Sequence, residues 1–90
     1  MNSDNLKKAV KLNKEIEKIK EIKSTCETAY KFIDQVEIDI KIDMENFHKI
    51  INNEKLYSII PRVTFIDFFG ILIENCDLKL EEIEKEIEEL

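Results

Sequence analysis

The stretch IDFFGILIENCDLKLEEIEKEIEEL, residues 66–90, decides the fold. Apolar side chains recur in it at alternating spacings of three and four: Ile66, Phe69, Ile73, Cys76, Leu80, Ile83, Ile87 and Leu90. This heptad pattern is typical of a helix that packs along another helix, and we call the row the seam of that helix. We expect the helix to span residues 62–90, beginning at Pro61 or at Thr64, where Asp67 completes the spacing of a capping box.

A second long helix is predicted over residues 4–32, with Ser3 or Asp4 as its N-cap. Its seam has the same spacing: Ala9, Leu12, Ile16, Ile19, Lys23, Cys26, Tyr30 and Ile33. Seven lysines lie within residues 7–23 and six glutamates within residues 81–89. An antiparallel pairing of the two helices places these opposite charges side by side, whereas a parallel pairing does not. We therefore predict an antiparallel helical hairpin in which Lys23 lies opposite Cys76.

Between the helices, VEIDIKID at residues 36–43 alternates apolar and charged side chains, which is the pattern of a half-buried strand. Residues 56–60 are the predicted partner strand, and residues 44–55 are a short helix or a loop, although FHKII at 47–51 could instead be a strand. Because a two-stranded ribbon is marginal alone, we expect it to rest on the helices or to join the same strand of a second subunit.

The predicted fold class is thus mainly α with a small β element. We expect a single domain, residues 1–90, built as a long, coiled-coil-like antiparallel helical hairpin with a short β-ribbon at its tip. Whether strand 36–43 pairs within or between chains is left open by the pattern.

Composition narrows the classes of function. The net charge of -6 argues against duplex DNA as a partner, because such binding draws on a basic surface. The apolar runs are far shorter than the roughly 20 residues that cross a bilayer, so we expect a cytoplasmic protein without a membrane partner.

Cys26 and Cys76 have neither CxxC spacing nor a nearby histidine, so we expect buried free thiols and no metal or cofactor. A short chain gains buried area by self-association, which favours a homo-oligomer.

The sequence carries no catalytic motif, and we predict a binding protein rather than an enzyme. Arg62 is the sole arginine and lies at the expected start of the C-terminal helix, where free N–H groups and the helix dipole favour an anion. We therefore predict an anion-binding site at Arg62, with Thr64 and Tyr57 in support and Lys41 as a further candidate. The alternative is that Arg62 forms an ion pair with Asp39, Asp43 or Asp67.

The order of a lysine-rich helix, the strand VEIDIKI, an IPR-type helix start and the ending EEIEKEIEEL resembles small accessory proteins of bacteriophages and prophages of AT-rich bacteria. The resemblance implies a role against bacterial defence in the cytoplasm of the host cell, and no catalytic residues carry over. It implies either sequestration of a small anionic immune signalling nucleotide, such as a cyclic nucleotide, or inhibition of a host defence protein by direct binding. Our first expectation is an oligomeric nucleotide-sequestering protein, and the protein inhibitor is the alternative.

Overall fold

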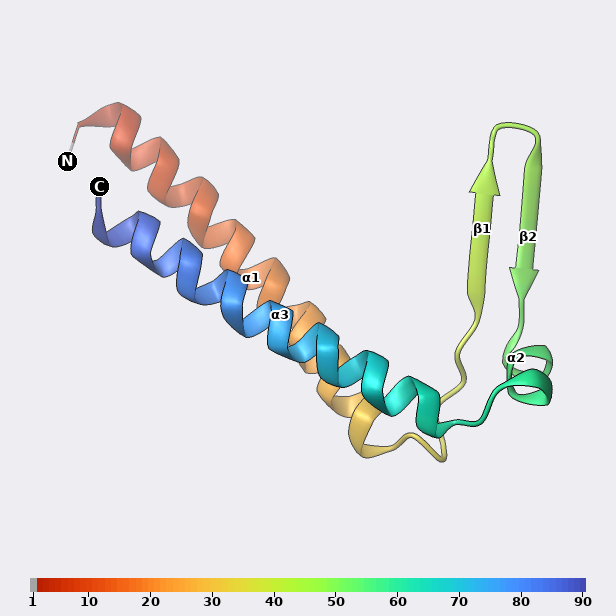
Figure 1. Cartoon of the computed structure of the whole chain (residues 1–90). Coiled ribbons are helices and arrows are strands. Elements are labelled where there is room, and N and C mark those ends of the chain that lie inside the picture. The colour runs from red at the N-terminus through yellow and green to blue at the C-terminus, as the bar shows by residue number, and fades with distance from the viewer. Residues whose placement is uncertain (1) are drawn as a thin grey trace.

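The computed structural model describes residues 2–90. Its elements follow in the order α1 (Ser3–Lys31), β1 (Ile40–Met44), β2 (Phe47–Ile51), α2 (Asn53–Ile59) and α3 (Val63–Glu88). α1 and α3 lie antiparallel and side by side, and the β1–β2 ribbon projects from one end of the helical pair (Figure 1). The molecule measures 55 × 35 × 15 Å. The predicted fold class, a long helical hairpin with a small β-ribbon at its tip, is confirmed.

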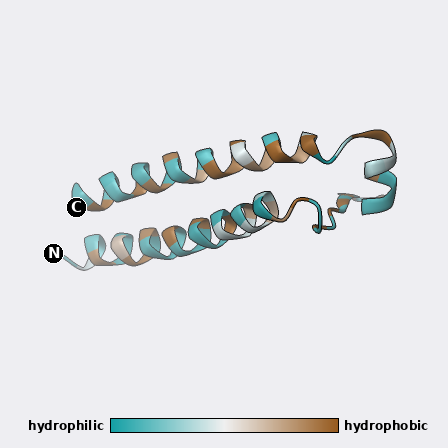
Figure 2. Cartoon of the chain, turned by 90° about the horizontal axis from the view of Figure 1, so that it is seen from below, coloured by the Kyte–Doolittle hydropathy of each residue, from teal (hydrophilic) through white to brown (hydrophobic). Residues whose placement is uncertain are grey.

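The α1–α3 contact follows the predicted seams with one exception. Every seam residue of α3 is buried or half-buried, and Ile83 is the most buried at 1% exposed. In α1 the prediction for Tyr30 was wrong, because Tyr30 is exposed and Ala29 is buried in its place. Either residue fits a step of three and four between Cys26 and Ile33, and the small Ala29 is the one accommodated beside α3. Figure 2 shows the hydrophobic colour of α3 densest in the half that begins next to the ribbon.

An ion pair joins α1 and α3 near the middle of the helical pair. Lys23 Nζ lies 2.6 Å from Asp77 Oδ1, so the predicted position opposite Cys76 is confirmed to within one residue. The hydrogen bond to Asp77 raises the pKa of Lys23 above its ordinary 10.5. Cys26 and Cys76 are free and buried, and burial, followed by the nearby Cys76, raises the pKa of the Cys26 thiol.

Both long helices start differently from the prediction. The N-cap of α1 is Asn2, not Ser3 or Asp4, because the side-chain oxygen of Asn2 accepts a main-chain hydrogen bond three residues on, at 2.8 Å. The predicted capping box at Thr64 does not form. α3 begins at Val63 without a side-chain cap, so Thr64 lies inside its first turn.

The ribbon forms within the chain, between β1 and β2. Ile40 pairs with Ile51 and Met44 with Phe47, and two residues, Glu45 and Asn46, make the turn. The predicted strand 36–43 therefore begins late and pairs with FHKII, which is a strand, not with residues 56–60. A two-residue turn closes a far smaller loop than a connection to residues 56–60 would, and the entropic cost of closure is lower.

The predicted strand at residues 56–60 was wrong, since these residues lie in or directly after α2. The N-cap of α2 is Asn52, whose side chain accepts the N–H of Lys55 at 2.9 Å. The next residue, Asn53, binds the segment that precedes β1. Its N–H donates to Asp39 Oδ1 at 2.8 Å, and its own Oδ1 accepts the N–H of Ile38 at 3.3 Å. These bonds draw residues 38–39 toward α2.

Candidate functional site

The predicted anion site lies at the junction where α1, α2 and α3 meet. A small buried core forms there from Ile33, two residues after α1, Leu56 of α2 and Phe65 of α3. The ring of Tyr57 packs edge-on against Phe65 with 5.7 Å between the ring centroids. Arg62, just before α3, lies over the ring of Tyr57, with its guanidinium carbon 4.0 Å from the ring centroid. The junction therefore stacks a cation on an aromatic ring above a packed core.

The guanidinium of Arg62 is bound to the main chain at the end of α1. Its Nη1 donates to the carbonyl oxygens of Ile33 at 2.9 Å and Val36 at 3.2 Å. Both carbonyls belong to the segment that follows α1, where Ile33 is buried and Val36 half-buried, and a carbonyl shielded from water needs a hydrogen-bond donor. Arg62 thus joins the start of α3 to the segment that follows α1.

A depression of about 660 Å³ adjoins Arg62, lined by Glu37, Asp39, Asn52, Asn53, Glu54, Tyr57, Ser58 and Arg62. The structure brings Arg62 and Tyr57 together in this lining but leaves the other two predicted ligands outside it. Thr64 is exposed on α3, and Lys41 lies on β1 with its Nζ 3.2 Å from Asp43 Oδ2. The lining contains three carboxylates and one guanidinium, so the charge of the depression opposes an anion. The hydroxyl of Tyr57 is buried and has no hydrogen-bond partner.

The two faces of the β1–β2 ribbon differ sharply in polarity. Side chains that oppose each other in an antiparallel pair share a face. By the register, one face, which we call the apolar face, carries Ile40, Ile42, Met44, Phe47 and Ile51, with Lys49 as its charged member. The other face carries Lys41, Asp43, His48 and Ile50. On that polar face, Asp43 contacts Lys41 along the strand and His48 across it.

The apolar face is exposed except at Ile51, which is half-buried against the core of the junction. Met44 is 63% exposed and Phe47 46%, and Ile40 and Ile42 keep 40% and 38% of their surface in solvent. Figure 1 shows why: the ribbon stands away from α1 and α3 and neither helix covers it. Exposed contiguous apolar surface of this kind marks sites where another molecule binds. The sequence pattern predicted the strand but missed Met44 and Phe47. The signal for a ribbon was the alternating IKIDM followed by two polar residues and by FHKII, the segment given above as a possible strand.

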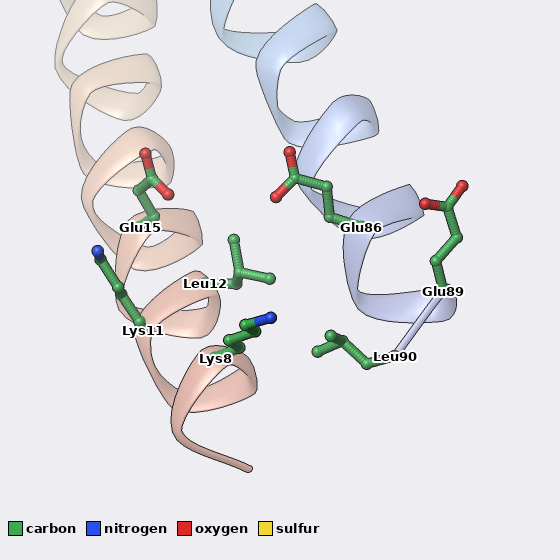
Figure 3. A pocket seen from close by; sticks show the side chains of 7 residues that line it. All are labelled: Lys8, Lys11, Leu12, Glu15, Glu86, Glu89 and Leu90. Carbon is green, nitrogen blue, oxygen red and sulfur yellow. The ribbon is translucent and has the colours of Figure 1, made fainter. Parts of the chain in front are cut away.

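A second depression, of about 520 Å³, lies at the opposite end of the molecule between the ends of α1 and α3 (Figure 3). Its lining combines Leu12 and Leu90 with charged side chains of both signs: Lys8, Lys11, Glu15, Glu86 and Glu89. The ion pairs within 4.0 Å among residues 2–90 do not include these side chains. The complementary charges of the helix ends thus act at longer range, where they favour an orientation more than they stabilise a contact.

Within residues 2–90, no group of three or more histidine, cysteine, aspartate or glutamate side chains is placed to hold a metal ion. No single helix in this range is long and apolar enough to cross a membrane, and α2 and α3 pass such a test only as a pair bent by 109°. Comparison of the chain with protein families, characterised proteins and solved structures finds no match.

Proposed function

We propose that the protein is a non-enzymatic binding protein that docks onto a partner protein through the apolar face of its ribbon. The observation that carries this proposal is the exposure of Met44 and Phe47 on a ribbon that neither α1 nor α3 covers. Methionine and aromatic side chains are enriched in protein interfaces, and burying them gives about 25 cal/mol per Å² of apolar surface. The partner surface is apolar, with an acceptor or a carboxylate for Lys49.

The resemblance to phage accessory proteins supports a particular class of partner. It favours a protein of the bacterial defence machinery in the host cytoplasm, which the ribbon would block by occupying its surface. This is the inhibitor function expected as the alternative from the sequence, and the exposed apolar face makes it the better supported of the two.

Affinity capture from a bacterial lysate tests the proposal, with three single variants compared against the unmodified protein. Met44→Asp and Phe47→Asp place a charge on the apolar face and should abolish capture of a stoichiometric protein partner. The matched control is Leu78→Asp, which places the same charge at a 56% exposed leucine of α3 and should leave capture unchanged. Equal capture by Phe47→Asp and the unmodified protein, with both folded by circular dichroism, would contradict the proposal.

A small anionic ligand at the junction is the second candidate function. The stacked Arg62 and Tyr57 and the unpartnered Tyr57 hydroxyl support it, and the three carboxylates of the same depression weigh against it. Calorimetric titration with a panel of cyclic nucleotides tests it directly, together with mass analysis of the denatured extract for a co-purifying nucleotide. Binding that is lost in Arg62→Ala but kept in Leu78→Asp would favour this candidate. An absence of heat with every nucleotide would remove it.

A further inference from the structure

The ribbon has two outer edges, because its sheet contains only β1 and β2 among residues 2–90. Each outer edge presents main-chain N–H and C=O groups that can pair with another strand. An isolated two-stranded ribbon is marginally stable in water, whereas three or more strands with an apolar face are stable. A further strand at one edge would therefore stabilise the ribbon as well as extend it.

The side chains of β1 are complementary to those of a second β1 in the antiparallel direction. β1 reads Ile40, Lys41, Ile42, Asp43, Met44, which places a lysine and an aspartate symmetrically about Ile42. A twofold axis through Ile42 sets Lys41 of each copy opposite Asp43 of the other, and Ile40 opposite Met44. Opposite charges that face each other across strands are favourable.

The main chain of β1 supports the same pairing. The residues that flank a two-residue turn form a hydrogen-bonded pair, and hydrogen-bonded and non-hydrogen-bonded pairs alternate from there. Counting from Met44, the free N–H and C=O groups at the outer edge belong to Lys41 and Asp43. A twofold axis at Ile42 makes these residues hydrogen-bonded partners, so the charge pairs and the main-chain bonds coincide.

Other pairings are less favourable. An axis at Lys41 or at Asp43 sets that residue against its own copy, and like charges directly opposite are destabilising. An axis at Ile40 would need residues 38–39, which lie outside β1 and are bound to Asn53. The β2 edge is not self-complementary, since Lys49 stands at its centre and an antiparallel copy would meet it with the same charge.

We propose that two copies of the chain associate through β1, antiparallel about Ile42, to form a four-stranded sheet in the order β2–β1–β1–β2. In Figure 1 neither a helix nor another strand lies alongside the outer edge of β1, which opens into the angle between the ribbon and the helical pair. The twofold axis is perpendicular to the sheet, so the apolar faces of both copies lie on the same side. This pairing uses the edge of β1 and does not depend on a protein partner for the apolar face.

Reversed charges test the register. Lys41→Asp makes two carboxylates face each other in each pair, and Asp43→Lys makes two ammonium groups do so. Each variant alone should weaken dimerisation by roughly tenfold or more, because both charge pairs become repulsive. Mixing the two variants should restore a dimer, now a heterodimer, since every facing pair is again of opposite sign. The double variant Lys41→Asp/Asp43→Lys should also dimerise.

Sedimentation velocity and native mass spectrometry give the readout, since a monomer has a mass of 10.7 kDa. The control is Lys49→Asp, which changes the net charge as Lys41→Asp does but lies on β2 and should leave the dimer intact. Recovery of the heterodimer on mixing distinguishes a repelled edge from a misfolded chain. An unmodified protein that stays monomeric up to about 1 mM would overturn the proposal. So would a dimer that both single variants leave unchanged.

Discussion

Ile83 is the residue at which truncation should reveal the seam most clearly. It is 1% exposed and lies on α3 in the glutamate-rich half, where few other apolar side chains support the contact. Ile83→Ala removes three carbon atoms, worth about 0.8 kcal/mol each in transfer free energy. Truncation of a buried isoleucine to alanine lowers the free energy of unfolding by about 2–5 kcal/mol in total. We expect about 3 kcal/mol here, because two helices can close partly over the gap.

Urea and thermal unfolding, followed by circular dichroism at fixed protein concentration, measure this loss. A loss of about 3 kcal/mol corresponds to a fall in Tm of about 12–24 °C for a chain of this size. Ile83→Val should cost about 0.5–1.5 kcal/mol, and the control Leu78→Ala, at a 56% exposed position of the same helix, less than about 0.5 kcal/mol. Equal losses for Ile83→Ala and Leu78→Ala would refute the assignment of the seam.

Further measurements address other parts of the chain. Gly70→Ala should raise the free energy of unfolding by about 0.5–1 kcal/mol, since a Cβ there meets nothing within 4 Å; a loss in urea melts would show a hidden contact. Arg62→Ala and Arg62→Lys should each lower it by about 2 kcal/mol, because lysine cannot reproduce the guanidinium geometry; full stability of Arg62→Lys would contradict this. Lys23→Leu should raise Tm but loosen the helix register, visible as broadened NMR resonances, and a lower Tm would show that the ion pair outweighs apolar burial. The raised pKa of Cys26 leaves less thiolate at pH 8, so this thiol should react with a disulfide reagent more slowly than free cysteine; an equal rate would indicate an open seam.

The helical hairpin was predictable because its two seams and its charge blocks agree. The spacing of Ile66, Cys76 and Ile83 requires a second apolar row, and the lysine and glutamate blocks select the antiparallel direction. The position of Lys23 followed from aligning the rows and agrees with the structure to within one residue. In long helices of this kind every heptad repeats the same apolar spacing, so the sequence specifies the helix at many positions.

The connection between the helices was predicted less well because each of its short segments fits two structures. Residues 56–60 are apolar except for Ser58, β-branched in part and followed by Pro61, which suits a strand end or a helix end. The decisive signal was Asn52, the N-cap of α2, which lies in the stretch 44–55 that the prediction gave as a short helix or a loop. With residues 56–60 in a helix, the partner of β1 had to come from the other candidate, FHKII.

The role of Arg62 could be predicted only in part. Its position at the start of α3 was correct, but its hydrogen bonds go to carbonyls 29 and 26 residues earlier in the chain. No local pattern indicates contacts at that separation. The carboxylates around it likewise converge from segments on both sides of the ribbon, and their effect on an anion emerges only from the fold.

Both ends of the described chain lie at the pole of the molecule farthest from the ribbon, where Lys8 and Leu90 share one depression. A short linker between them would close the chain into a ring without disturbing the helices. Opening that ring between Glu45 and Asn46 would give a circular permutant with its new ends at the ribbon tip. In this permutant α1 and α3 would remain covalently linked, while β1 and β2 would become two separate terminal segments. Folding of the helical pair and binding through the ribbon could then be measured separately in one polypeptide.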